Sequence, residues 1–418
     1  MYKKIKADNY NIHFIKTDKF KTITLKINFK RKLIKEEVTI RNLLIDTLFS
    51  STQKYPSKRL MEIETENLYG LAYRGFVFQS GIYSILSLET TFLADKYTDK
   101  SNTLNSINFI KEVLFNPNIS NNQFDKDGFN YAYNNLEAEI LSTKENTNLY
   151  SQMRLAELME DPIISIHNVG KIDALKKINA KMLYDYYLDV LNNDNVDIYI
   201  IGDIDEKIIN YIKDNFIFSK RAKYTDSHLY SPLDYHKKTN EYIELNKTNQ
   251  SKLAIGLKLM NLTNFERRYV LSIYNYILGG SGDSKLFKNI REKESLCYTI
   301  ASQTFPLTGL LLIRAGIDSD KYSKTIKLIK KEIVSIENNE FSDLDIQNGI
   351  KTYISGLKEL KDSPNGILSY YMSMDYVQAD NFNNKIRNIK KVTRKDILNL
   401  AKKIKLDTIY LLKGDIND

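Results

Sequence analysis

The residues with the clearest chemical potential lie between Gly279 and Tyr298. A helix follows a short turn and carries Arg291, and Tyr298 comes seven residues later, in the next expected strand. A guanidinium is a rigid, permanently charged donor to oxygen acceptors, and a phenol hydroxyl can donate to an oxygen that gains charge. The segment therefore offers two donors and one fixed positive charge. Its opening turn consists of small residues: Gly279, Gly280, Ser281 and Gly282.

Simpler roles exist for each of these residues. Arg291 could form a surface ion pair with Glu292 or Glu294, and Tyr298 could be one of 29 tyrosines that pack in a sheet. The glycine turn could belong to a nucleotide loop. However, the third glycine of a Gly-x-Gly-x-x-Gly element is missing and no Gly-Lys-Ser/Thr follows, so phosphate binding is not expected.

Metal and thiol chemistry find little support. The four histidines, at positions 13, 167, 228 and 236, have no His or Glu three or four residues later, so no metal ligand is assigned. The single cysteine, Cys297, could be a nucleophile, but its place between Leu296 and Tyr298 favours a small apolar residue. One cysteine excludes an internal disulfide and fits a reducing cytoplasm.

The elements that must position these residues occur twice. Segments 197–205 and 407–417 are β-branched strands that close on Gly-Asp, and each follows a helix with an N-cap candidate, Asn179 or Thr393. Segments 57–64 and 284–291 also align, which places Tyr73 near Tyr298 after a two-residue slip. Segments 83–90 and 310–317 are expected to be matching strands. A period of about two hundred residues indicates two homologous domains.

The sequence predicts an α+β protein in which each domain is an antiparallel sheet covered by helices. Strand 22–29 and helix 38–50 are examples from the first domain. The expected boundaries are 1–218 for the N-terminal domain, 219–240 for a polar linker, and 241–418 for the C-terminal domain with Arg291 and Tyr298.

The repeat, the Gly-Asp strand ends and the segment from Gly279 to Tyr298 together resemble the M16 (insulinase and mitochondrial-processing-peptidase-like) metallopeptidases. Active members carry a zinc motif, His-x-x-Glu-His, on a helix of the first domain. Here that helix places Asn42, Ile45 and Asp46 at the His, Glu and His positions. Isoleucine cannot transfer a proton, and Asn and Asp are poor substitutes for two imidazoles. Glu139 could be the surviving third ligand or an ordinary surface carboxylate.

The resemblance therefore implies the zinc-less, Arg/Tyr-bearing subunit of the YmfF-like bacterial group, which forms half of a clamshell. Its partner would be an M16-type subunit that bears His-x-x-Glu-His and holds the zinc, so this chain needs no cofactor. In the family, Arg291 would bind a carbonyl or carboxylate of a peptide substrate. Tyr298 would stabilise the oxyanion, and the glycine turn would lie at the chamber wall.

Two other functions stay open: an inert peptide-binding or scaffold protein, perhaps a homodimer, and a zinc peptidase with atypical ligands. The net charge is +9, but the lysines are scattered, as in the amphipathic segment 324–333, so no nucleic-acid partner is expected. No apolar stretch reaches the ~18 residues of a membrane helix. The first residues lack the apolar run of a signal peptide, so we expect a cytoplasmic protein without a membrane partner.

Overall fold

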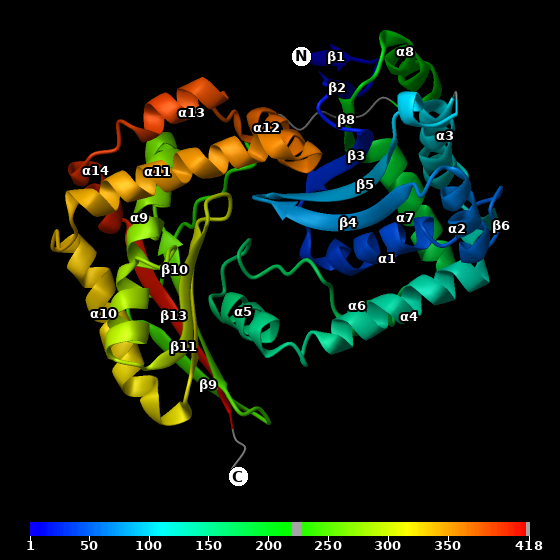
Figure 1. Cartoon of the computed structure of the whole chain (residues 1–418). Coiled ribbons are helices and arrows are strands. Elements are labelled where there is room, and N and C mark those ends of the chain that lie inside the picture. The colour runs from blue at the N-terminus through cyan, green and yellow to red at the C-terminus, as the bar shows by residue number, and fades with distance from the viewer. Residues whose placement is uncertain (100, 220–226, 415–418) are drawn as a thin grey trace. The chain divides into compact units, whose positions relative to one another are not determined.

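The computed structural model describes residues 1–99, 101–219 and 227–414, which form two compact units (Figure 1). Part of the expected linker, residues 220–226, lies outside the described residues. No described helix is long and apolar enough to cross a bilayer. The first unit comprises Met1–Ser142, Asn168–Ser227 and Pro364–Ser369, and the second comprises Thr143–His167, His228–Ser363 and Tyr370–Asp418.

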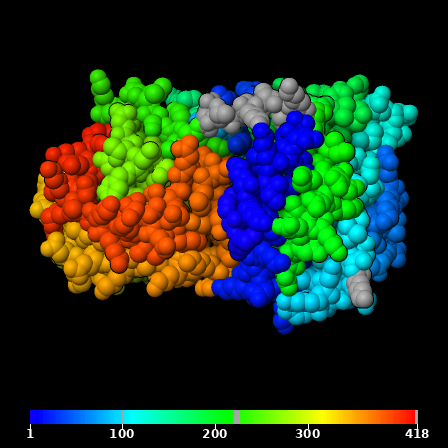
Figure 2. All heavy atoms as spheres, turned by 90° about the horizontal axis from the view of Figure 1, so that it is seen from above, coloured from blue at the N-terminus to red at the C-terminus, as the bar shows by residue number. Residues whose placement is uncertain are grey.

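The first unit is built on a six-stranded sheet with the order β1-β2-β8-β3-β5-β4. The central strand β3 alternates strictly: Ile23, Leu25, Ile27 and Phe29 enter the helix-covered core, whereas the intervening residues are polar. Strands β1 and β2 lie beside helix α8 (Glu206–Asn215) on the surface (Figure 2). There Lys3 pairs with Glu206. The strands are β1 Tyr2–Lys6, β2 Asn11–Lys16, β3 Thr22–Lys32, β4 Ala72–Ser80, β5 Tyr83–Leu93 and β8 Asn195–Gly202.

Helices cover the apolar face of this sheet and supply most of its core. Helix α1 is buried along most of its length, and helices α3 and α7 add apolar residues to the same core. Asn179 caps α7 as predicted, because its side chain accepts from the amide of Met182. The helices of this unit are α1 Val38–Leu48, α2 Lys58–Asn67, α3 Asn102–Phe115, α4 Lys126–Ser142, α6 Ile172–Leu175, α7 Ala180–Asn193 and α8 Glu206–Asn215.

The second unit contains a five-stranded sheet with the order β11-β12-β10-β13-β9. Both faces of its central strand are buried. Leu253, Ile255 and Leu257 face the core formed with α9 (Leu271–Leu278), α10 (Tyr322–Glu337) and α14 (Arg394–Ala401). Helix α5 (Thr147–Leu158) lies on the opposite side of the sheet (Figure 1). There Ala254 packs in one cluster with Leu155. The strands are β9 Asn240–Asn246, β10 Ser251–Leu259, β11 Cys297–Phe305, β12 Leu310–Ile317 and β13 Ile404–Gly414.

The helices of the second unit include two π-helical segments, one of which carries Arg291. The predicted amphipathic segment 324–333 lies in α10, with Ile326, Ile329 and Ile333 buried. Thr393 forms a capping box at the start of α14. The segments are α5 Thr147–Leu158, η3 Glu266–Val270, α9 Leu271–Leu278, η4 Phe287–Lys293, α10 Tyr322–Glu337, α11 Asp343–Glu359, α13 Phe382–Ile389 and α14 Arg394–Ala401; helix α12, Pro364–Val377, is shared by both units.

Five strands of the first sheet share the topology of the second sheet, which confirms the prediction of two similar α+β halves; β1 is the additional strand. Strand β3 lies between β5 and β8 as β10 lies between β12 and β13, and β4 and β11 occupy the same edge. The predicted strand pairs, 83–90 with 310–317 and the two Gly-Asp strands, take equivalent places. Each sheet also contains one parallel pair, β2 with β8 and β9 with β13, which the antiparallel prediction did not include.

Candidate functional site

Arg291 and Tyr298 line one cavity of about 350 Å³ in the second unit. Helix η4, strand β11 and the segment after strand β12 form its walls. The cavity thus gathers a cation and a phenol that are seven residues apart in the chain, together with an acid and a second cation from a different element. The lining residues are Arg291, Ser295, Leu296, Cys297, Tyr298, Asp318 and Lys321.

Tyr298 owes its position to a β-bulge. In the ladder between β11 and β12, Cys297 pairs with Ile317 and Thr299 pairs with Gly316, so Tyr298 is the extra residue. A bulge bends its strand and redirects the side chain of the unpaired residue. Tyr298 is accordingly 59% exposed, unlike an ordinary packed sheet residue.

Arg291 projects from the π-helical segment η4, Phe287–Lys293. Its guanidinium lies over the Phe287 ring, with Cζ 4.7 Å from the ring centroid. Two ion pairs hold η4 and the residues beside it to α10: Lys285 with Glu332 at 3.4 Å, and Glu294 with Lys324 at 2.7 Å. Glu294 therefore pairs with Lys324, and the alternative pairing with Arg291 is not observed.

Asp318 connects Tyr298 to Lys321. The Tyr298 hydroxyl donates to one carboxylate oxygen of Asp318 at 3.2 Å, and the Lys321 ammonium donates to the other at 2.7 Å. The hydrogen bond from Lys321 is the main reason that the pKa of Asp318 lies below its usual value. Asp318 is therefore an ionised acceptor within hydrogen-bonding distance of the Tyr298 hydroxyl.

The glycine turn supports the site from outside the cavity. Gly279 ends α9, and its carbonyl accepts from the amide of Ser302 on β11 at 2.9 Å. A Cβ on Gly279 would lie 2.8 Å from that amide nitrogen, and one on Gly280 would lie 2.5 Å from the Asn275 side chain. Gly279 permits the close approach of helix and strand, Gly280 permits the turn to fold back on Asn275 of α9, and Gly282 has open space around its Cα.

Cys297 lies in the cavity wall as a half-buried thiol. Burial raises its pKa to about 11, and the nearby Arg291 charge offsets only part of this shift. Because the thiolate is the reactive form, a thiol with this pKa is a poor nucleophile near neutral pH. The geometry agrees with the interpretation of Cys297 as a small apolar residue.

The helix at the position of the zinc motif does not offer a zinc-binding set. The Asn42 amide donates to the carbonyls of Val38 and Asn168, and Ile45 is buried in the core. Burial, and secondarily repulsion from Glu139 on helix α4, raise the pKa of Asp46 to about 7. An amide, an alkyl chain and a carboxyl that readily holds a proton do not fit zinc, which prefers imidazole, thiolate and ionised carboxylate.

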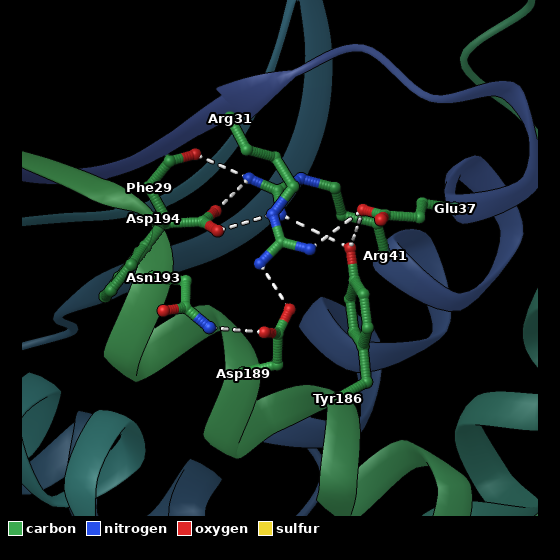
Figure 3. Close-up of polar contacts among 8 residues, drawn as sticks. All are labelled: Phe29, Arg31, Glu37, Arg41, Tyr186, Asp189, Asn193 and Asp194. Carbon is green, nitrogen blue, oxygen red and sulfur yellow. Dashed lines mark hydrogen bonds and ion pairs between the residues drawn. The ribbon is translucent and has the colours of Figure 1, made fainter. Parts of the chain in front are cut away.

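A buried ionic network fixes this helix to the sheet (Figure 3). Arg41 on α1 donates to Asp194 and to the Phe29 carbonyl, each at 2.6 Å. Arg31 on β3 shares the same carboxylate at 2.5 Å and also pairs with Asp189 at 2.6 Å. The Arg41 and Asp194 side chains are at most 1% exposed, so each charge depends on the other for solvation.

The structure thus brings Arg291 and Tyr298 together and places the predicted glycines behind them. Sequence reasoning missed Asp318 and Lys321. A signal for them existed, because β11 and β12 form a hairpin whose pairing begins at Phe305 and Leu310. Counting outward from that turn brings the residue after Ile317 beside the start of β11.

Two similar α+β halves, of which only the second carries the Arg/Tyr pair, define an M16-type peptidase shell without a zinc motif. Residues 177–353 match the family model described as "Peptidase M16 inactive domain", a range that includes Arg291 and Tyr298. The chain is similar to peptidase M16 proteins.

Individual relatives agree with this assignment. The "Probable inactive metalloprotease YmfF" of Bacillus subtilis is 27% identical over 98% of this chain and 97% of its own length. A conserved protein from Enterococcus faecalis has a solved structure with 26% identity, full coverage of both chains and a TM-score of 0.92. The peptidase M16 inactive domain from Pseudomonas fluorescens, 14% identical, shares the fold with a TM-score of 0.79 over 100% of this chain and 99% of its own.

Proposed function

We propose that this chain is the zinc-less partner subunit of a two-chain M16-type peptidase of the cytoplasm. The partner, bearing His-x-x-Glu-His, supplies zinc, the activated water and the general base. This chain supplies Arg291 to hold a peptide oxygen and Tyr298 to donate to the developing oxyanion. Alone, it does not hydrolyse peptides.

One observation carries the proposal: the second unit directs Arg291 and Tyr298 into one cavity by two unusual elements, a π-helix and a β-bulge. Both elements interrupt regular hydrogen bonding, and both recur at functional sites. Helix α1 also supports the proposal that the partner holds the zinc, because the side chains of α1 at the zinc-motif positions do not suit zinc.

Reconstitution with an M16-type subunit that bears His-x-x-Glu-His tests this function. Peptide hydrolysis should require both chains. Arg291→Ala should lower kcat/KM about 100-fold or more. Tyr298→Phe should raise the activation free energy by a few kcal/mol, because it removes a donor to the oxyanion. Lys293→Gln, on the same helix but outside the cavity lining, is the matched control. Full activity of the pair with both site variants would instead favour an inert scaffold.

The alternative of an atypical zinc peptidase has its own test. Asp46 and Glu139 lie close enough for the charge of one to affect the other, so metal analysis of the purified chain after dialysis is decisive. We expect no stoichiometric zinc. Zinc retained by this chain but lost from Asp46→Asn would refute the partner-subunit proposal.

A further inference from the structure

The outer edge of strand β9 has no neighbour of the kind that covers the matching strand of the first sheet. In the first unit, β2 pairs in parallel with β8 and carries β1, antiparallel, on its other side. In the second unit, β9 pairs in parallel with β13 in the same way, and the strand order of the sheet ends there (Figure 1). Among the residues that the structure describes, no strand takes the place of β1 beside β9.

The exposure of the two matching strands reflects this difference. When the sheets are matched at Tyr199 and Tyr410, Phe14 of β2 corresponds to Ile243 of β9. Phe14 is 2% exposed in the core of the first unit, whereas Ile243 is 58% exposed. Leu245, two residues further along the same face, is 65% exposed. Strand β9 thus presents two adjacent large apolar side chains to water.

The edge of the second sheet also lacks the usual protection against pairing with another chain. The matching edge of the first sheet is β1, where Lys3, Lys4 and Lys6 are exposed, and lysines on an edge strand oppose such pairing. Strand β9 has the sequence Asn-Glu-Tyr-Ile-Glu-Leu-Asn, with neither lysine nor proline. An exposed, apolar and unprotected edge is the expected property of a strand that another strand covers in the assembled protein.

The sequence of β9 favours a second copy of the same strand as this neighbour. In an antiparallel pairing centred on Ile243, this residue lies opposite Ile243 of the second copy, and each Leu245 lies diagonally beside it. The four exposed apolar side chains then cover one another on one face of a continuous sheet. Such a contact is closed, because a two-fold axis at Ile243 uses the free edge of both copies and leaves none for a third.

The charges beside these residues suit the same pairing. Glu241 would lie opposite Leu245 of the second copy and diagonally beside Lys247, which is exposed after the end of the strand. The Glu241 carboxylate pairs with Lys330 of its own chain at 3.1 Å, but it is half-exposed and accessible to a second cation. No like charges lie directly opposite in this register, whereas a pairing centred on Glu244 would oppose two carboxylates.

We propose that β9 is the interface of a two-fold homodimer, in which two copies of this chain join their second-unit sheets edge to edge around Ile243. The proposal goes beyond the peptidase role and does not depend on it. Tyr298 lies on β11, at the opposite edge of the same sheet, so the homodimer leaves that edge unused. One seven-residue strand from each copy is a small interface, so the dimer should dissociate on dilution through the micromolar range.

Sedimentation equilibrium of the purified chain tests the assembly. We expect a monomer–dimer equilibrium that Ile243→Lys shifts toward the monomer. Because the two-fold axis introduces the new charge twice at an apolar contact, the dissociation constant should rise about tenfold for each copy and about 100-fold in total. Leu344→Lys adds the same charge at an exposed leucine of α11 and should keep the dissociation constant of the parent. Thermal melts verify that each variant is folded.

Cross-linking tests the register of the two strands. In a Cys297→Ser background, Ile243→Cys should form an intermolecular disulfide on mild oxidation, because only a residue on the two-fold axis lies opposite itself. Leu344→Cys should not. If the parent stays monomeric, the edge serves another partner and the proposal is overturned. A dimer that survives Ile243→Lys, a dimer without the Ile243→Cys cross-link, or open-ended assemblies larger than a dimer would each overturn it as well.

Discussion

The carboxyl of Asp46 should make this protein more stable in mild acid than at neutral pH. Burial first, and the Glu139 charge second, raise its folded-state pKa from 3.8 to about 7. At pH values between these two pKa values, Asp46 is protonated in the folded chain and ionised in the unfolded chain. The free energy of unfolding therefore falls as pH rises from about 4 to about 7 and then levels off.

The shift of about three pKa units corresponds to a loss of about 4 kcal/mol, at 1.36 kcal/mol per unit. Asp46→Asn keeps the shape of the side chain and cannot ionise, so it should recover this loss. We expect the free energy of unfolding of the variant to be about 4 kcal/mol higher than that of the parent at pH 8, and equal to it near pH 4. For a unit of this size, such a gain is about 10 °C in the melting temperature of the first unit.

Thermal and urea melts of both chains at unit steps from pH 4 to pH 9 would measure the difference. Glu139→Gln should raise the free energy of unfolding at pH 8 by less than Asp46→Asn does, because it removes only the second cause of the raised Asp46 pKa. Glu66→Gln, an exposed acid on α2, removes the same charge and serves as the control. The reasoning predicts that the gain in free energy of unfolding from Asp46→Asn is larger at pH 8 than at pH 5. An equal gain at both pH values would show that Asp46 of the folded parent is already ionised at pH 5, and would refute the raised pKa.

Three further predictions concern positions that support the two sites. Arg41→Met should lower the free energy of unfolding by about 3–5 kcal/mol in urea melts, because it leaves a buried Asp194 charge with fewer donors. Gly279→Ala should lower the free energy of unfolding by about 1–3 kcal/mol in the same melts, since its Cβ would lie 2.8 Å from a backbone nitrogen. Gly282→Ala, in open space, should leave the free energy of unfolding nearly unchanged. Cys297 should react with iodoacetamide at pH 8 about 100-fold more slowly than an exposed thiol, as its pKa of about 11 implies; an ordinary rate would contradict the burial of the thiol.

The parts of the fold that the sequence predicted are those with strong local signals. Alternation marks β3, helical periodicity marks α10, and the caps Asn179 and Thr393 mark helix starts, so each element is specified by neighbouring residues. Their repetition in the chain then indicated two similar halves. The parallel neighbours β2 and β9 were missed, because they join the sheet through partners about 170–190 residues away that no local pattern identifies.

The docking of helix α5 could not be predicted for the same reason. It lies between the helices of the first unit in sequence, yet Leu155 and Met159 pack on β10 of the second unit. Gly256 makes this possible, since a Cβ there would lie 2.4 Å from the Met159 sulfur. A glycine within a strand only indicates that something comes close, and the sequence does not say what.

Within the candidate site, the residue types were predictable but their exposure was not. The two edge strands of the repeat show why. In the first unit, β4 pairs regularly with β5, and Tyr73 stacks on Phe49 while its hydroxyl is held by Lys58 and Glu62. In the second unit, one additional residue in β11 breaks the register at Tyr298 and leaves its phenol accessible.

The same comparison indicates why only one half offers donors to a ligand. When the sheets are matched at Tyr199 and Tyr410, Tyr73 corresponds to Ile300, so the bulge residue Tyr298 has no regular counterpart in β4. Glu64 takes the place of Arg291 in the aligned helix, which would bring an acid where the second unit has an unpaired base. Two sheets of similar topology thus differ in chemistry through a single inserted residue and a reversed charge. Both changes place a basic side chain and an exposed phenol in the second unit, at positions where the first unit has an acid and a packed ring.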